Sequence, residues 1–512
     1  MTLAHAAAVK SISYVTADNG EKMNKIRYTA IALLIISLLF FSCDLDRDKF
    51  ELKGNFWAKD FLKDNDYRVD AELLFQNSLC EVWVEKGSGV TVSQAEQIAD
   101  EYTDINNKLI DSFSEINFTA FDQTFTNILH FAGWLVGRDA KLTILLLDIK
   151  DGYHPTHNRS YIAGYFWGGD LMNIAGSNGR VMVYIDTNPG LESGNLDRAY
   201  STLAHELQHL MNFATSFVKR RDGNYVTVME TWVNEGLSES AEHLCYGPTE
   251  DRISWYNNNG DEFGSMKGLI NRGNNFYIWG NRESESIYAV LDDYSTVYLF
   301  FQWLRIQFGG SGIYKDIISS NRADYRAVLD NVAGYSNWEN LLRDWLAANY
   351  INASTGRYSY NEAVEEDEKI KITAKHIAPA GFPTATITSL FPGEGVYSIT
   401  NTSPSLPVQG ANIVNTFLVG DLVSPSYQEG SILLTFNKNT NINGSRENGY
   451  ITGISASITP SASITPARSL ITVPNAGPYR IGAGDLLKRY GNEAALSVTD
   501  FPVIINGAAI AE

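Results

Sequence analysis

The sequence contains little cysteine, and its three cysteines cannot form the sulfur-rich sites that often hold zinc. They stand at positions 43, 80 and 245 of 512 residues, so no CxxC pair exists. A zinc site held by cysteine pairs is therefore excluded. If Cys43 belongs to an export signal, Cys80 and Cys245 remain. They form either one disulfide or two free buried thiols, because their spacing does not decide between these states.

Basic residues are also scarce relative to acidic ones. The chain has 40 Lys and Arg against 59 Asp and Glu, which gives a formal net charge of −19. This charge argues against duplex nucleic acid as a partner, and its simplest interpretation is solubility. Charged residues make up 19% and apolar residues 44%, the balance of a folded chain rather than a disordered one.

No apolar run is long enough to span a bilayer, but a shorter run lies near the N-terminus. The run from Ala30 to Phe41 is broken only by Ser37 and is 12 residues long, whereas a transmembrane helix needs about 20. Its length suits the h-region of a secretory signal that starts at Met23. The run ends at Ser42-Cys43, which resembles a bacterial lipoprotein signal. That resemblance implies residues 1–43 as a signal region and lipidation at Cys43, with secretion without lipid as the alternative.

Apolar patterning divides the rest of the chain into three parts. We expect residues 44–61 to form a charged tether, residues 62–355 a first folded domain, and residues 356–512 a β-rich domain. Strand-forming runs occur within residues 67–84, 141–149, 161–167 and 180–186, and a helix is expected to begin after Ser93 as its cap. The patterns predict an α+β fold, in which a sheet within residues 62–190 precedes a mainly helical part, residues 191–355.

Three long helices are expected in that helical part. Apolar residues at helical spacing predict helices over residues 196–217 and 226–246, and "DDYSTVYLFFQWLRIQF" predicts a third. After residue 357, short β-rich runs alternate with Pro, Gly, Ser and Asn, which is typical of an all-β domain. The tandem "SASITP" at residues 455–466 is interpreted as a low-complexity loop.

The first of these helices contains "AHELQHLMNF", residues 204–213, a candidate metal site. His205 and His209 are four residues apart, so on a helix their side chains differ by about 40° in direction and about 6 Å in rise and can converge on one ion. Two imidazoles suit Zn²⁺. Glu206 points about 100° away and can reach a water at an open coordination position. In a chain of this length and composition, the expected number of chance matches to this pattern is on the order of 0.01. The alternative interpretation is an exposed polar face of the helix.

A third ligand is available on the next helix. Glu235 follows His209 by 26 residues, in "METWVNEGLSESAEHL". Here the sequence resembles the gluzincin metallopeptidases and is most similar to the hyicolysin family, over about residues 66–350. The resemblance implies a zincin-like catalytic domain in which His205, His209 and Glu235 bind zinc and Glu206 is the general base. It also implies that Glu239 braces the first histidine, a role in which a carboxylate accepts the second imidazole N–H. Glu230 and Glu242 are expected on a solvated acidic face, and His243 at the surface.

The third helix carries a second resemblance, to gluzincin aminopeptidases whose corresponding helix opens with a tyrosine. This resemblance implies that Tyr294 donates a hydrogen bond to the oxyanion, a role that suits a neutral phenol. The alternative is a core aromatic at helical spacing. "GGDLMN" from Gly168 lacks the glutamate of the aminopeptidase GxMEN segment, which favours an endopeptidase. The metzincin class is excluded, because Asn212 and Thr215 stand where it needs Gly and His.

The expected activity is therefore zinc-dependent peptide hydrolysis, with Glu206 taking a proton from water and returning it to the leaving amine. The substrate would pair with an edge strand within residues 162–185. Two alternatives stay open: a catalytically silent surface-binding lipoprotein or adhesin that keeps the zincin fold, and a structural protein that binds no metal. The C-terminal β region is expected to serve as a spacer, or to bind matrix or glycan.

Overall fold

The computed structural model describes residues 54–113, 141–156, 161–171, 176–191, 196–222, 225–258, 269–279, 289–362, 368–378, 389–399, 410–444, 446–448 and 480–482. The expected signal region, with its start at Met23 and the lipidated Cys43, lies outside these residues, as does the "SASITP" repeat. Within the described part of the chain, no helix combines the length and apolar character needed to cross a membrane.

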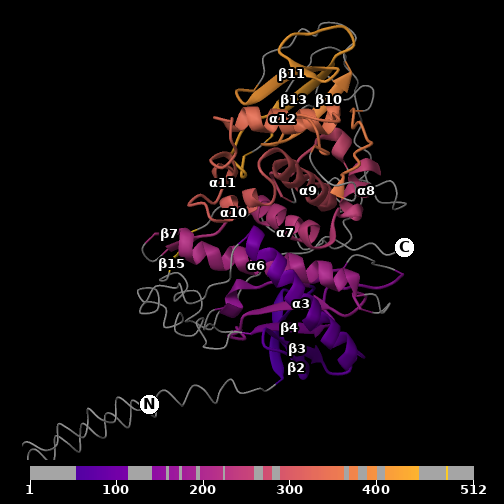
Figure 1. The fold of residues 1–512 in the computed structure, drawn as a ribbon, viewed down its shortest axis with the longest axis vertical. Helices are drawn as coiled ribbons and strands as arrows, with labels where there is room; N and C mark the ends of the chain where they lie inside the picture. Colours follow the sequence, from indigo (N-terminus) through magenta and orange to yellow (C-terminus); the bar gives the residue numbers. More distant parts are fainter. Residues whose placement is uncertain are drawn as a thin grey trace, which may run out of the picture. The chain divides into compact units, whose positions relative to one another are not determined.

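The N-terminal half of the described chain is built on one mixed sheet (Figure 1). Its strands are β1 (Asn55–Asp60), β2 (Asn65–Gln76), β3 (Cys80–Glu85), β4 (Leu142–Leu147), β5 (Gly164–Tyr165) and β6 (Met182–Asp186), in the order β1-β2-β3-β4-β6-β5. The strands β3, β4 and β6 run parallel, whereas β1, β2 and β5 are antiparallel to their neighbours. The short strand β5 therefore lies at one edge.

Two expectations about this sheet need correction. Residues 55–60, assigned to the tether, form β1, because Phe56 and Ala58 are buried in the core and the strand pairs with β2 along its whole length. The strand expected over residues 161–167 shrinks to β5, because the chain turns into the 3-10 helix η2 (Gly168–Leu171) directly afterwards. The pattern of apolar and polar residues alone does not show where this turn begins.

One helix packs against the sheet before the helical part begins. The helix α3 (Val92–Ser112) contacts β2, β3 and the later helix α6. Its N-cap is Thr91, which forms a capping box with Gln94, rather than the expected Ser93 two residues later. Cys80 lies buried at the start of β3 and Cys245 in the helical part, and both are free thiols. The structure thus decides the alternative that the sequence left open.

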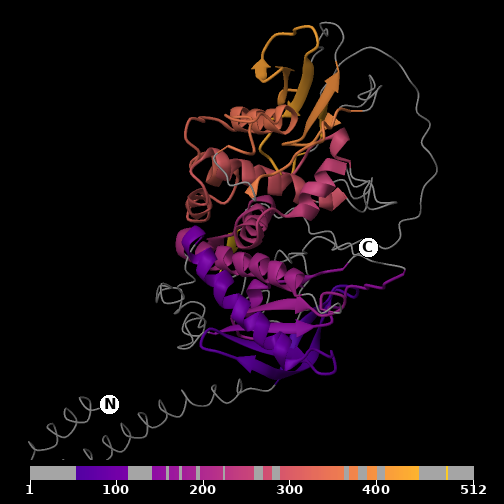
Figure 2. The same cartoon turned by 45° about the vertical axis from the view of Figure 1, so that its right-hand side comes forward.

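The helical part contains α6 (Asp197–Lys219), α7 (Thr231–Tyr246), α8 (Glu250–Asn258), α9 (Ala289–Gln307), α10 (Gly312–Ile318), α11 (Tyr325–Leu329) and α12 (Trp338–Ile351). The helix α6 contacts the sheet at β5 and β6, α7 packs on α6, and α9 packs on α7 (Figure 2). The helix α7 begins five residues later than expected, because residues 225–227 form β8. That strand pairs with β7 (Arg221–Asp222) and with β15 (Arg480–Gly482).

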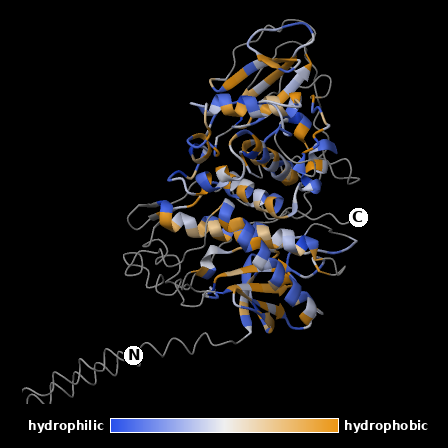
Figure 3. Ribbon diagram, viewed as in Figure 1, coloured by the Kyte–Doolittle hydropathy of each residue, from blue (hydrophilic) through white to orange (hydrophobic). Residues whose placement is uncertain are grey.

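The C-terminal region is an all-antiparallel sheet, as expected for its fold class. Its strands are β10 (Gly395–Ile399), β11 (Ile413–Val419), β12 (Leu422–Ser424) and β13 (Ile432–Asn437), in the order β10-β13-β11-β12, and a separate pair joins β9 (Ser389–Leu390) to β14 (Glu447–Asn448). Apolar residues recur along its strands (Figure 3). The hydroxyl of Tyr397 on β10 donates to the carbonyl of Leu346 on α12 at 2.6 Å, so the sheet shares a core with the helices.

Candidate metal centre

The helix α6 places His205, Glu206 and His209 inside the protein. Leu203, Leu207 and their neighbours on α6 are buried, so this part of the helix has no solvent face. The rings of His205 and His209 lie one turn apart with centroids 4.6 Å from each other. The exposed polar face that could have explained these residues is therefore absent from this stretch of helix.

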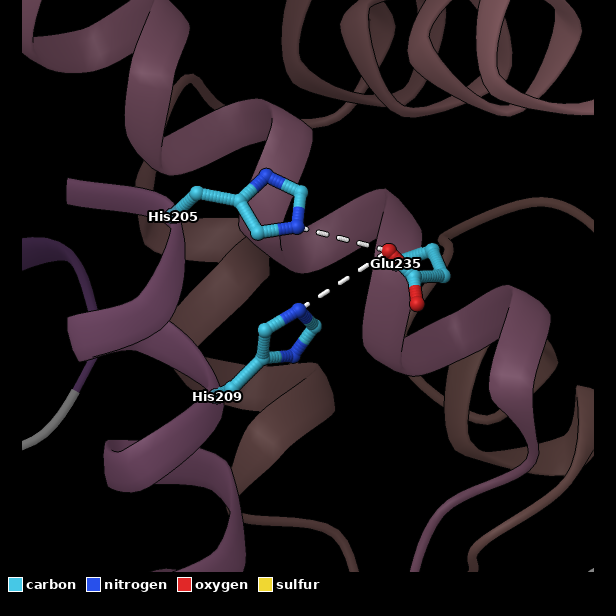
Figure 4. Close-up of side chains that lie close together, drawn as sticks. All are labelled: His205, His209 and Glu235. Atoms are coloured by element: carbon cyan, nitrogen blue, oxygen red, sulfur yellow. Dashed lines mark ion pairs between the residues drawn. The ribbon is translucent and has the colours of Figure 1, made fainter. Parts of the chain in front are cut away.

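The helix α7 brings Glu235 to the two imidazoles. Oε2 of Glu235 lies 3.4 Å from Nε2 of His205 and 3.8 Å from Nε2 of His209, as Figure 4 shows. The next residue, Gly236, permits close packing of α7 on α9: a Cβ at this position would stand 2.2 Å from the ring of Phe301. The absence of a side chain at position 236 thus helps to hold the carboxylate helix against α9.

Several polar atoms in and beside this centre are buried and have no hydrogen-bond partner among the described residues. They are Nε2 of His205, Nε2 of His209, Oε2 of Glu235 and both carboxylate oxygens of Glu206. Buried polar atoms are normally satisfied, so a group of orphaned acceptors at one point indicates a missing ligand. Two imidazoles and one carboxylate with a further position open are the donor set of a catalytic zinc site. The residues present therefore fit a zinc ion.

The second nitrogen of each imidazole has its own partner. Nδ1 of His205 lies 2.7 Å from Oε1 of Glu242. The other oxygen of Glu242, Oε2, accepts a hydrogen bond from the hydroxyl of Ser201. Nδ1 of His209 lies 2.9 Å from Oγ of Ser238, whose hydroxyl donates to Oε1 of Gln208 at 2.6 Å. With Nδ1 as the donor in both rings, each Nε2 presents its lone pair to the centre.

The expected brace of His205 needs correction. Glu239 instead accepts a forked pair of hydrogen bonds from Arg252, and Glu242 occupies the bracing position. Glu242 follows Glu235 by seven residues, close to two helical turns, and therefore faces the same side of α7. This i+7 spacing was the available signal that the sequence analysis missed.

Two further side chains, one at the N-cap of α7 and one on the helix itself, are not at the surface, contrary to expectation. Glu230, just before α7, is buried and accepts a hydrogen bond from Nε1 of Trp232 at 2.7 Å. His243 is buried between the hydroxyl of Tyr298 and the guanidinium of Arg305, each 2.9 Å from a ring nitrogen. Burial, together with the charge of Arg305, lowers the pKa of His243 to about 3. Both side chains are buried because α7 lies between α6 and α9 and has almost no exposed face.

Charges in the centre affect one another strongly. Burial holds the pKa of the Glu206 carboxyl well above its usual range, and the nearby charges of Glu235 and Glu242 add to this effect. Burial by itself would lower the pKa of His205, but its contacts with Glu235 and Glu242 raise it well above the usual range. The centre is thus rich in negative charge and favours a bound cation.

The helix α9 places Tyr294 at the same point. The hydroxyl of Tyr294 is hydrogen-bonded to Glu235, and its ring packs edge-to-face on Trp279 with centroids 4.9 Å apart. Burial raises the pKa of this phenol well above its usual range, so its hydroxyl keeps its proton. Tyr298, one turn later, instead contacts His243. The two tyrosines of this helix therefore have different surroundings.

The edge strand lies beside the centre. Strand β5 contacts α6, and a Cβ at Gly164 would stand 2.6 Å from the Thr202 side chain. The backbone N–H of Phe166, directly after β5, is near enough to Glu206 to lower the pKa of its carboxyl against the effect of burial. The strand edge and the carboxylate of Glu206 therefore belong to one site.

Comparison with known proteins gives two matches. Residues 168–262, which contain His205, His209 and Glu235, match a family described as a predicted Zn-dependent protease. A stretch of 309 residues is 29% identical to the neutral metalloprotease ShpI of Staphylococcus hyicus. These matches support a zinc metallopeptidase family. The second match covers 58% of this chain and 62% of the relative. Zinc is accordingly the cofactor that the matches and the buried cluster of two histidines and a glutamate support.

Proposed function

We propose that this protein is a zinc-dependent endopeptidase in which His205, His209 and Glu235 hold the metal. The observation that carries the proposal is the convergence of two imidazole Nε2 atoms and one carboxylate oxygen, all buried and unpaired, at one point. A purely structural cluster would satisfy these atoms within the protein. The match of this segment to predicted Zn-dependent proteases supports the same conclusion.

Glu206 is the proposed general base. Zinc would supply Lewis-acid chemistry, which acidifies water and polarises a carbonyl oxygen. Neither carboxylate oxygen of Glu206 has a hydrogen-bond partner among the described residues, so one can take a proton from the attacking water. Burial raises its pKa, which suits a group that must hold this proton and then pass it to the leaving amine. A zinc site that served only as a scaffold would have no use for this carboxylate.

Tyr294 is the proposed donor to the oxyanion. Its buried hydroxyl remains protonated and already reaches the ligand carboxylate of Glu235. A fixed O–H donor at the point where negative charge develops stabilises the transition state more than the ground state. Glu242 and Ser238 keep the two imidazoles in the required tautomer, because each accepts a hydrogen bond from the Nδ1–H group of one ring.

The proposed substrate is an extended protein or peptide segment. The strand β5 is the outermost strand of the sheet as far as it is described, so it offers backbone hydrogen-bonding groups near Glu206, and an extended chain can add to such an edge. Without the glutamate that the aminopeptidases use to hold a substrate amine, nothing in "GGDLMN" selects a chain end. Cleavage within a chain is therefore the proposed mode.

We further propose that the protein is exported and carries a lipid anchor at Cys43. The apolar run before Ser42-Cys43 supports this location. A peptidase held by lipid at the cell envelope would act on proteins or peptides outside the cytoplasm.

A digest of a peptide library, with and without a chelator, tests the proposed function. We expect one zinc per chain by elemental analysis, cleavage at internal peptide bonds mapped by mass spectrometry, loss of cleavage with chelator, and recovery with added zinc. Stoichiometric zinc without hydrolysis would instead indicate a silent, surface-binding protein. The absence of stoichiometric zinc would overturn both readings.

A further inference from the structure

The centre contains a buried arginine that peptide hydrolysis does not by itself require. Arg252 lies near the start of α8, and its guanidinium reaches between α7 and α9. Its Nε and Nη2 donate to the two oxygens of Glu239 at 3.0 and 2.8 Å. A two-pronged contact of this kind fixes the plane of the guanidinium as well as its position.

The guanidinium also lies over the ring of the proposed oxyanion donor. The guanidinium carbon of Arg252 is 4.6 Å from the centre of the Tyr294 ring, within the distance of a favourable cation–π contact. Trp279 meets the same ring edge-to-face, at an interplanar angle of 83°. The phenol is therefore held on two sides, and its hydroxyl is directed to Glu235.

The arginine also offsets a concentration of negative charge. Glu235, Glu239 and Glu242 are buried on one side of α7, within three turns of helix. Buried like charges destabilise one another unless an opposite charge is near. Arg252 is held close to these carboxylates and contacts one of them directly.

We propose that Arg252 is a positioning residue for the oxyanion donor. Held by Glu239, its guanidinium plane fixes the ring of Tyr294, so that the hydroxyl stands ready at the centre. Arg252 acts through Tyr294 and does not itself touch the substrate. The inference rests on the proposed peptidase function. It explains why Glu239, which the sequence resemblance assigns to His205, is instead committed to an arginine.

A double-mutant cycle tests this role. Arg252→Lys keeps the charge but loses the fork and the flat face, and Tyr294→Phe removes the hydroxyl. On one mapped peptide we expect Arg252→Lys to lower kcat about tenfold and to change KM less than about twofold. In the Tyr294→Phe background the same substitution should change kcat less than about twofold, because its target is gone.

Measurements that do not depend on turnover accompany the cycle. Arg252→Lys should retain one zinc per chain, and its affinity for a phosphonamidate peptide, measured by calorimetry, should fall by about the same factor as kcat/KM. Arg343→Lys is the matched control, because Arg343 also donates to a buried carboxylate, that of Asp344, outside the metal centre. This control should leave kcat unchanged.

Two outcomes decide the matter. If the losses from Arg252→Lys and Tyr294→Phe multiply, Arg252 does not act through the phenol and the inference is wrong, even though the chain is a peptidase. If the unmodified chain shows no chelator-sensitive cleavage, the proposed function fails and the inference fails with it. Should Arg252→Lys not fold, Glu239→Gln loosens the same fork, and its kcat loss must likewise vanish in the Tyr294→Phe background.

Discussion

Two regions of this protein bury carboxylates, and they treat them differently. On α12, the oxygens of Asp344 are bound by the hydroxyl of Tyr335 and by the guanidinium groups of Arg343 and Arg357. In the metal centre, both oxygens of Glu206 and one of Glu235 have no partner among the described residues. The comparison teaches that satisfied buried charge indicates structure, whereas unsatisfied buried charge indicates a site that a ligand completes.

The largest expected effect comes from the metal centre, where the carboxylate of Glu206 has no hydrogen-bond partner among the described residues. Glu206→Gln keeps the size of the side chain but removes the proton acceptor. We expect kcat to fall about 10³-fold, which is the usual contribution of a general base, while zinc remains bound because Glu206 is not a ligand. Steady-state kinetics and elemental analysis measure the two quantities. Turnover equal to that of the unmodified protein would remove Glu206 from the mechanism.

A substitution at Asp344, whose buried carboxylate is fully hydrogen-bonded, should lower the stability of the fold rather than turnover. Asp344→Ala leaves two partly exposed arginines and one tyrosine hydroxyl without their acceptor. We expect the free energy of unfolding to fall by about 2 kcal/mol, because the hydrogen bonds to the carboxylate are lost while the arginines, which reach solvent, can turn to water. Denaturant unfolding measures the loss. The folded fraction should keep its zinc and its kcat; a loss of zinc here would mean that the two regions are not independent.

A third prediction compares the partners of the two imidazoles. Glu242→Gln replaces the charged acceptor of His205, and Ser238→Ala removes the neutral acceptor of His209. Loss of such a partner typically weakens zinc affinity about 10–100-fold. We expect the larger loss from Glu242→Gln, since a charged acceptor raises the basicity of an imidazole more than a hydroxyl does. Competition with a chromophoric chelator ranks the two variants, and the reverse order would contradict this account.

The sequence predicted the parts of the site that depend on spacing along one helix. The i, i+4 relation of His205 and His209 holds because the apolar pattern of α6 was unambiguous. The structure also brings Glu235 to them from the next helix. Glu242 was missed although its i+7 spacing from Glu235 was visible in the sequence. Arg252 was missed because its contacts join separate helices and depend on helix crossings that no single pattern records.

The fold was predictable to a similar degree. The mixed sheet, the following helices and the all-β C-terminal region were expected, and the structure has them. The ends of elements were less accessible to pattern reading: β5 is shorter than its run, and α7 begins after β8. The strand β5 ends early because the chain turns into η2. The helix α7 begins late because residues 225–227 pair with β7 and β15, so tertiary pairing overrides local preference there.

A pH-dependent effect on stability should come from a buried acid outside both regions. Asp170, in η2, accepts hydrogen bonds from the hydroxyl of Tyr184 and from the backbone N–H of Asn178. Burial raises its pKa to about 7 despite these contacts. Because the folded state then holds a proton that the unfolded state releases above about pH 4, this group costs stability progressively as the pH rises from about 4 to 7.

Asp170→Asn removes this titration while keeping an amide oxygen as acceptor. We expect the variant to gain stability relative to the unmodified protein as the pH rises through this window, with the difference constant above about pH 8. Urea unfolding at several pH values measures that difference. If it stays the same at pH 5 and pH 8, Asp170 is ionised in the folded protein. The acid would then resemble Asp344, its charge satisfied by its hydrogen bonds, rather than a carboxyl held neutral by burial.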